Sequence, residues 1–132
     1  MTNNALTLVA YMAILTWLTL MGASMIRSKG WTLKGTLLAM GNRDNLPAAT
    51  PLAGRAERAA RNTLENFILF AAIVLVAHAS GSSGDRVNCG AEIFFWARVV
   101  YIPVYYAGIS YIRTGVWVVS LVGLGTILST IV

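Results

Sequence analysis

The chain of 132 residues carries too little charge to cover a water-soluble globule. Hydrophobic residues make up 57% of it and charged residues 11%, whereas soluble domains have roughly 45–50% apolar and 25% charged residues. Disorder is excluded as well, because it requires low hydrophobicity and high net charge. With a mean hydropathy of +0.67, the composition indicates a small membrane protein.

The formal net charge is +5. In a soluble protein this excess would suggest nucleic acid as a partner, but here the basic residues lie beside apolar runs, where membrane topology explains them. We therefore expect no nucleic acid. Cys89 and His78 are the only residues of their types, which excludes an intrachain disulfide and a cysteine or histidine metal cluster, so no metal is expected.

The first predicted helix covers residues 5–26, carries no charge and ends at Arg27. The first 26 residues contain no basic residue, so we interpret this run as a retained helix and not as a signal peptide. A polar loop, residues 28–54, is expected to follow, because glycines, prolines and the turn-rich residues 41–45 interrupt it.

Three further segments are long enough to span a bilayer, at residues 58–80, 90–110 and 115–132. The last carries no charge, whereas the two middle segments span only if their charges face protein or a water-filled cavity. The sequence therefore predicts an all-α integral membrane protein, a four-helix bundle formed by one domain of residues 1–132.

Basic residues are distributed unevenly between the two sides of this bundle. The loop opposite the 28–54 loop has only Arg86. The positive-inside rule then places the 28–54 loop and Arg113 in the cytoplasm and both termini outside. The basic residues that flank or occupy the first loop are Arg27, Lys29, Lys34, Arg43, Arg55, Arg58 and Arg61.

The second predicted helix has one polar face. At about 100° per residue, its polar side chains fall within an arc of about 140°. Glu65 lies about 10 Å deeper than Arg58, where an ionised carboxylate costs several kcal/mol unless it is paired. The residues of this face are Arg58, Arg61, Asn62, Glu65 and Asn66.

The third predicted helix supplies a possible partner for Glu65. Arg98, Tyr101 and Tyr105 share one face through their i, i+3, i+7 spacing. If this helix ends near Gly108, Arg98 lies about 15 Å from the cytoplasmic edge, in the same half as Glu65. The two polar faces imply a salt bridge between Glu65 and Arg98, a lined cavity, or both.

Four motifs in chain order resemble the MAPEG family, the membrane-associated proteins in eicosanoid and glutathione metabolism. Residues 57–66, ERAARNTLEN, resemble its second-helix signature, and residues 97–101, ARVVY, with Tyr105 resemble its third-helix motif. Residues 41–44, GNRD, and 111–117, YIRTGVW, are similar to the bacterial branch. The resemblance covers nearly the whole chain.

The resemblance implies a homotrimer in a bacterial inner membrane, with glutathione held at each subunit interface near the cytoplasmic side. It implies a detoxifying enzyme that adds the glutathione thiolate to a lipophilic electrophile from the bilayer or reduces a lipid hydroperoxide. Arg27 is similar to an arginine that reaches a neighbouring subunit's site, and Arg113 resembles the arginine near the thiol, with Thr114 as an auxiliary donor. The candidate glutathione-contacting residues are Arg27, Arg58, Arg61, Asn62, Glu65, Asn66, Arg98, Tyr101 and Tyr105.

The chemistry of these side chains suits glutathione, which has two carboxylates, one ammonium and one thiol. Arginine forks bind carboxylates, the Glu65 carboxylate suits the ammonium, and the Asn62 amide both donates and accepts. A guanidinium such as that of Arg113 near the sulfur favours the nucleophilic thiolate.

Other interpretations of the same residues stay open. Arg58 and Arg61 can extend to lipid headgroups, Tyr101 and Tyr105 can belong to an interfacial aromatic belt, and Arg113 can be a topological anchor. The alternative functions are a non-catalytic scaffold that binds membrane lipid or glutathione, and a cation exporter that uses Glu65 as its intramembrane acid. His78 is expected to make a polar contact at the outer end.

Overall fold

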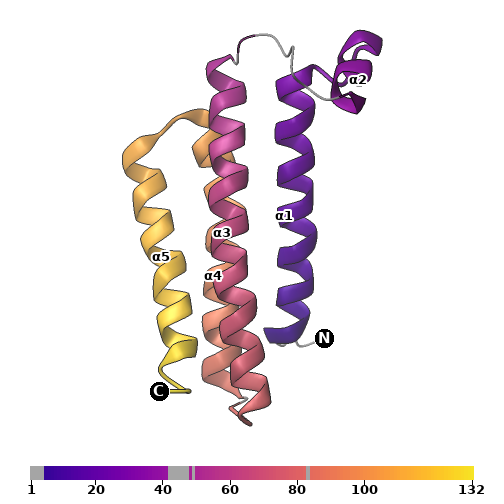
Figure 1. Cartoon of the computed structure of the whole chain (residues 1–132). Helices are drawn as coiled ribbons and strands as arrows, with labels where there is room; N and C mark the ends of the chain where they lie inside the picture. Colours follow the sequence, from indigo (N-terminus) through magenta and orange to yellow (C-terminus); the bar gives the residue numbers. More distant parts are fainter. Residues whose placement is uncertain (1–4, 42–47, 49, 83) are drawn as a thin grey trace.

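The computed structural model describes residues 5–41, 48, 50–82 and 84–132, and all regular structure among them is helical. Four long helices run side by side, and a short one lies against the outer side of α1 (Figure 1). We call the end of the bundle that carries the short helix the α2 end. Ala5 and the C-terminus both lie at the opposite end (Figure 1). The helices are α1 (Ala5–Ser28), α2 (Leu33–Met40), α3 (Pro51–Ala79), α4 (Asp85–Ala107) and α5 (Ser110–Leu128).

The helices α1, α3, α4 and α5 are each long and apolar enough to cross a membrane. They have 24, 29, 23 and 19 residues, against the roughly 20 that a bilayer requires. The prediction of an all-α bundle with four membrane spans is confirmed.

The beginning of α3 differs from the prediction. This helix begins at Pro51 and not near residue 58. Thr50 is its N-cap, with Oγ1 accepting a hydrogen bond of 3.1 Å from the backbone N–H of Ala53, and Pro51 occupies the first turn, where a missing N–H costs nothing. The segment 28–54 is therefore not a continuous loop, because it contains α2 and the first turn of α3.

The connection between α4 and α5 is also shorter than expected. The fourth span was predicted to begin at residue 115, but Ser110 already begins α5. The chain turns at Gly108, whose φ of 77° is in the left-handed region that favours glycine, so the predicted end of the third span near Gly108 is confirmed. Two parts of the predicted connections lie outside the described residues: turn residues 42–45, and Ser83 between the second and third predicted spans.

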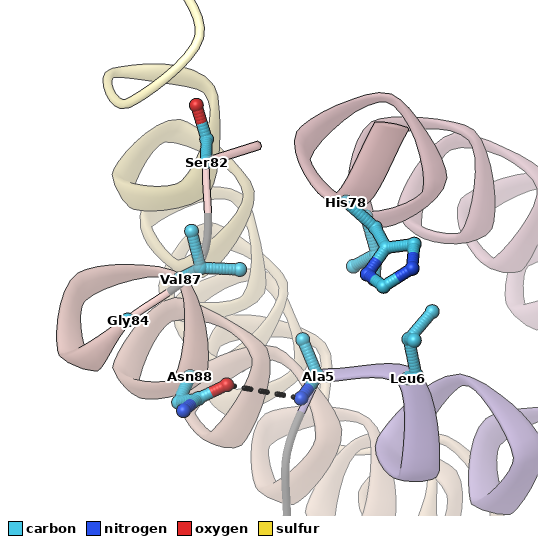
Figure 2. Close-up of a pocket in the computed structure, with 8 residues that line it drawn as sticks. Ala5, Leu6, His78, Ser82, Gly84, Val87 and Asn88 are labelled. Atoms are coloured by element: carbon cyan, nitrogen blue, oxygen red, sulfur yellow. Dashed lines mark hydrogen bonds between the residues drawn. The ribbon is translucent and has the colours of Figure 1, made fainter. Parts of the chain in front are cut away.

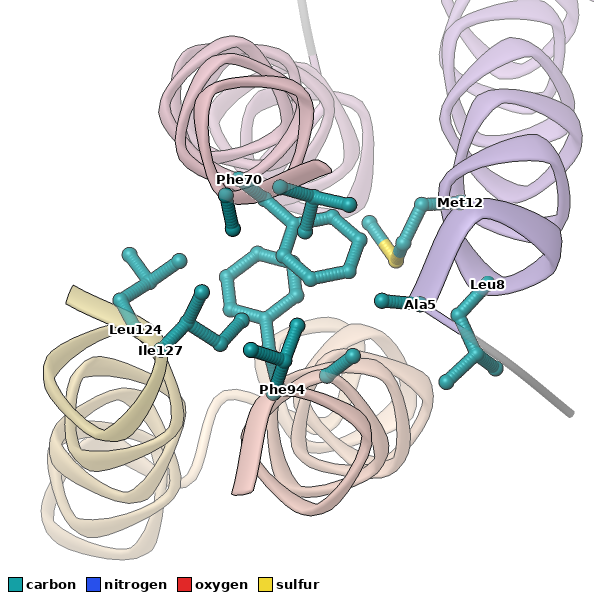
Figure 3. Close-up of a cluster of buried hydrophobic side chains, with 11 residues drawn as sticks. Ala5, Leu8, Met12, Phe70, Phe94, Leu124 and Ile127 are labelled. Atoms are coloured by element: carbon teal, nitrogen blue, oxygen red, sulfur yellow. The ribbon is translucent and has the colours of Figure 1, made fainter. Parts of the chain in front are cut away.

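The main apolar core fills the half of the bundle away from α2. The rings of Phe70 and Phe94 stack with centroids 4.3 Å apart, and Met12 of α1 and Ile127 of α5 close around them (Figure 3). Because lipid tails are as apolar as these side chains, dispersion contacts and close packing stabilise this core more than removal from water does.

Two glycines set the distance between α4 and α5. A Cβ atom built on Gly123 would lie 2.7 Å from the carbonyl oxygen of Gly90 and 2.8 Å from the backbone nitrogen of Phe94. The two backbones are therefore in direct contact, which is typical of membrane helices that cross at small residues.

We predict that Gly123→Ala lowers the free energy of unfolding by about 1–3 kcal/mol, because the added methyl group overlaps the backbone of α4. Thermal unfolding in detergent measures the change. The matched control is Gly125→Ala on the same helix, where an added Cβ meets nothing within 4 Å. Equal melting temperatures for the two variants would contradict the prediction.

Candidate functional site

A polar hollow of about 340 Å³ lies between α3, α4 and α5, in the half of the bundle nearer the α2 end. Three cationic side chains, one carboxylate, one amide and two phenols line it. The residues are Arg58, Arg61, Asn62 and Glu65 from α3, Tyr101 and Tyr105 from α4, and Arg113 from α5. The structure thus brings together, in one place, predicted site residues from three helices.

The sequence of α3 explains why its polar face is available. Ala56, Ala59, Ala60 and Thr63, spaced i, i+3, i+4, i+7, are buried against the bundle. Small residues on this side allow the neighbouring helices to approach closely, so the charged side chains point away from the helix contacts. Arg58, Arg61 and Glu65 are exposed.

Tyr105 holds two of the arginines. Its hydroxyl accepts a hydrogen bond of 3.3 Å from Nε of Arg58. On its ring face, the guanidinium carbon of Arg113 lies 4.5 Å from the ring centroid, a cation–π contact that contributes about 0.5–1 kcal/mol at an exposed site. Tyr101 meets Tyr105 edge to face at 5.5 Å. The tyrosine pair therefore fixes the positions of cations from two different helices.

A smaller hollow of about 130 Å³ adjoins the polar hollow and shares Asn62, Tyr101 and Arg113 with it. Thr114 and Trp117 complete its lining. The hydroxyl of Thr114 donates to the carbonyl oxygen of Ser110 at 3.1 Å. Trp117 was not among the site residues predicted from the sequence, although its place one turn after Arg113 on the same helix face was a signal for the site.

Arg98 lies behind the polar hollow and not in its lining. It is 0% exposed, its Nη2 donates to Oγ1 of Thr63 at 2.9 Å, and its guanidinium carbon lies 4.0 Å from the centroid of the Tyr101 ring. Of the two possibilities raised by the sequence, the structure shows the lined cavity, since no salt bridge joins Arg98 to Glu65 within the described part of the chain. Arg98 supports Tyr101, and Tyr101 lines the hollow.

Asn66, like Arg98, does not line the polar hollow but contacts a residue that does, Asn62. Its buried amide donates to the backbone oxygen of Asn62 at 2.8 Å and to Oδ1 of Asn62 at 3.2 Å. Because Asn66 occupies Oδ1, the Asn62 amide is left with Nδ2 as the group that can donate to a ligand in the hollow.

Arg27 lies on the other side of α3, in a groove of about 480 Å³ between α1 and α3. Glu57 and Arg61 also line this groove, so Arg61 borders both the groove and the polar hollow. Nη1 of Arg27 is buried without a hydrogen-bond partner. Within one chain, Arg27 shares this groove with Arg61 but does not line the polar hollow, and its reach into a neighbouring subunit stays a prediction.

Arg55 has a structural role that the sequence did not reveal. Its Nε donates to the backbone oxygen of Tyr106 at 3.0 Å. Carbonyl groups in the last turn of a helix lack intrahelical partners and carry partial negative charge, so a cation there stabilises the end of α4.

A separate hollow of about 230 Å³ lies at the opposite end of the bundle, beside His78 and Asn88 (Figure 2). Oδ1 of Asn88 accepts a hydrogen bond of 3.0 Å from the backbone N–H of Ala5, which caps the start of α1. His78 is the only titratable side chain in its lining. Nowhere in the described ranges do three His, Cys, Asp or Glu residues gather as metal ligands.

These observations define an integral, multi-pass membrane protein with a cationic hollow near one end of a four-helix bundle. The chain belongs to the MAPEG family, whose sequence model matches residues 4–132. Members of this family use glutathione. No curated protein and no solved structure matches the chain. The family predicted from the sequence motifs is confirmed.

We predict that Thr63→Val lowers the free energy of unfolding by about 1.5–3 kcal/mol, because the buried Arg98 guanidinium then loses its hydrogen bond to a neutral acceptor. Thermal unfolding in detergent is the measurement. Thr126→Val is the matched control, since the Thr126 hydroxyl bonds only within α5, to Val122.

Combining Thr63→Val with Arg98→Met tests whether Arg98 causes this loss of stability. In the background of Arg98→Met, Thr63→Val should cost little, because no buried charge is left unpaired. Full additivity of the two substitutions would show that the Thr63–Arg98 contact does not stabilise the protein.

Proposed function

We propose that the protein is a glutathione-dependent membrane enzyme that adds the glutathione thiolate to lipophilic electrophiles or reduces lipid hydroperoxides. The observation that carries this proposal is the composition of the polar hollow, where Arg58, Arg61, Arg113, Glu65 and Asn62 converge from two helices. Its volume of about 340 Å³ lies within the range of roughly 300–1,000 Å³ that is typical of small-molecule pockets.

Each polar group of glutathione has a complementary side chain in the hollow. The guanidinium groups of Arg58 and Arg61 suit the two carboxylates, because planar forks bind carboxylates through two parallel hydrogen bonds. The Glu65 carboxylate suits the ammonium. Asn66 donates to Oδ1 of Asn62, and Nδ2 of Asn62 can therefore donate to a peptide carbonyl of glutathione.

The reactive sulfur is assigned to the side of the hollow formed by Arg113. The ring of Tyr105 holds this guanidinium in place, and a fixed positive charge near the thiol stabilises the thiolate. In the addition reaction, the thiol releases its proton to solvent and the thiolate forms a carbon–sulfur bond with an activated double bond. The electron pair that this displaces onto the electrophile takes up a proton from solvent. In the peroxidase reaction, two glutathione molecules become the disulfide while the hydroperoxide becomes an alcohol and water.

An apolar groove of about 380 Å³ supports a lipophilic second substrate. It lies between α4 and α5, the helices that carry Tyr101 and Arg113, and its residues include Trp96, Val100 and Val116. Val116 is one turn from Arg113 along α5, so a molecule dissolved in the bilayer can approach the sulfur from this side.

We further propose that the protein is a homotrimer in a bacterial inner membrane, with the α2 end in the cytoplasm. Arg58, Arg61 and Glu65 are exposed on the side of a membrane bundle, where charges are costly unless protein or water covers them. A second subunit placed against the hollow provides that cover. Its Arg27, which lines the groove between α1 and α3, is then the residue that reaches the site from the neighbouring subunit.

We predict that Glu65→Gln weakens glutathione binding by about 1–3 kcal/mol, or roughly 5- to 150-fold, because the ligand's ammonium loses a charged hydrogen bond. Titration calorimetry on the detergent-solubilised protein measures the affinity. Glu92→Gln is the control, since the Glu92 carboxylate accepts from Trp96 on its own helix, 3.0 Å away.

Light scattering on the same samples should give the mass of a trimer for the wild type and for both variants. Unchanged affinity in Glu65→Gln would remove Glu65 from the binding site, and a monomer at every protein concentration would contradict the interfacial site.

We predict that bound glutathione shows thiolate ultraviolet absorbance between pH 6 and pH 8, below the pKa of about 8.5 of a free cysteine thiol. A neighbouring guanidinium lowers the pKa of the thiol, so the thiolate is present above that lowered pKa and is lost as the pH falls through it. Arg113→Ala should abolish the absorbance with little change in affinity, and Arg113→Lys should retain part of it.

The control for this experiment is Arg86→Ala, at the far end of the bundle from the hollow. Wild-type protein that binds glutathione without forming thiolate would contradict the catalytic proposal and favour a non-catalytic scaffold with the same fold.

A further inference from the structure

The short helix α2 presents an apolar stripe that none of the described residues covers. Leu33, Leu37 and Met40 are 78%, 62% and 79% exposed. At about 100° per residue they fall within an arc of about 60°, on one face of the helix. Trp31, just before the helix, is 66% exposed. Large apolar side chains gathered on one surface indicate an interaction site.

The stripe has a fixed direction, because α2 is attached firmly to the end of α1. Gly35 lies on the face opposite the stripe, and a Cβ atom there would overlap the carbonyl groups of Ser28 and Lys29. The Thr32 hydroxyl accepts from the backbone N–H of Gly35 at 2.9 Å, and the Thr36 hydroxyl donates to the oxygen of Gly30 at 2.8 Å. The apolar face is therefore the one turned away from α1. Figure 1 shows α2 beside the end of α1, at the margin of the bundle.

Within the described residues 5–41, the charges beside the stripe all have one sign. Lys29 and Lys34 are exposed, Arg27 lies in the last turn of α1, and residues 5–41 contain no acidic residue. Anionic phosphate groups are complementary to such a segment, and each basic residue near an anionic leaflet adds about 1 kcal/mol of attraction at low ionic strength. An apolar face with an aromatic residue and flanking lysines is the pattern of helices that lie in the membrane interface.

We propose that residues 29–40 are an interfacial anchor that binds anionic phospholipids. In this arrangement Leu33, Leu37 and Met40 enter the acyl boundary of the leaflet at the α2 end, with Trp31 at headgroup level. Lys29 and Lys34 contact the lipid phosphates. The anchor does not depend on glutathione binding. Because Gly35 packs against the end of α1, the anchor also fixes how deep that end lies in the membrane.

The position of Trp31 tests the apolar part of the anchor. The whole protein is reconstituted in phosphatidylcholine vesicles that contain phosphatidylglycerol, and the difference in tryptophan fluorescence between wild type and Trp31→Phe isolates Trp31. Lipids brominated near the headgroup should quench Trp31 more than lipids brominated near the chain end. Trp17, in the middle of α1, is the control. Its fluorescence is isolated in the same way, as the difference between wild type and Trp17→Phe, and should be quenched more by lipids brominated near the chain end.

The charge of the bound lipid tests the lysines. Brominated phosphatidylglycerol should quench Trp31 more than brominated phosphatidylcholine, and Lys29→Gln with Lys34→Gln should reduce this preference by about five-fold for each lysine. Arg86→Gln, at the opposite end, should leave it unchanged.

Three outcomes would overturn the proposal. Quenching of Trp31 by aqueous iodide, and by no brominated lipid, would place the segment in water. Protection from both iodide and brominated lipids would assign the stripe to a contact with another copy of the chain. Equal quenching of wild-type Trp31 by brominated phosphatidylglycerol and brominated phosphatidylcholine would show that the lysines do not bind anionic headgroups.

Discussion

The buried guanidinium of Arg98 is the constraint on which the arrangement of the site depends. It lies one turn from Phe94, whose ring belongs to the apolar core, and one turn from Tyr101, whose ring lines the polar hollow. Its Nη2 bonds to Thr63 and its guanidinium contacts the Tyr101 ring, whereas Nε and Nη1 are buried without a hydrogen-bond partner. A charge in this position therefore has little tolerance for losing either contact. The aromatic contacts continue from Tyr101 to Tyr105 and from Tyr105 to Arg113. The core and the hollow are thus parts of one connected structure.

Helix α3 is the wall that two neighbouring sites share. Its small residues face the bundle, and its charged residues line the polar hollow on one side and the Arg27 groove on the other. Arg61 borders both spaces. A change in the rotation of α3 about its axis would therefore alter the two spaces together. Between Ala53 and Thr63 the buried side of α3 consists of alanine and threonine, which fit closely against their neighbours and oppose such a rotation.

The sequence predicted the spans and the polar face of α3 because both depend on local periodicity. The sequence could not assign the partner of Arg98. Spacing places Arg98 on the same helix face as Tyr101, but it does not decide whether the Arg98 side chain extends into the hollow or lies beneath the Tyr101 ring. Thr63 gave no signal, because it falls among alanines on the packing face. Helix α2 was missed for another reason. Its eight residues lie between glycines, and its contact with α1 through Gly35 depends on tertiary structure.

The unequal lengths of the helices around the hollow determine where it meets the lipid. At 1.5 Å per residue, α5 with its 19 residues is about 28 Å long, slightly less than the roughly 30 Å of a bilayer's hydrocarbon layer, whereas α3 with 29 residues is about 43 Å long. Arg113, in the first turn of α5, therefore lies at the edge of the hydrocarbon, while α3 continues past it. Hydrophobic mismatch at α5 makes the entry of water to the hollow depend on bilayer thickness, and lipids of graded chain length would measure that dependence.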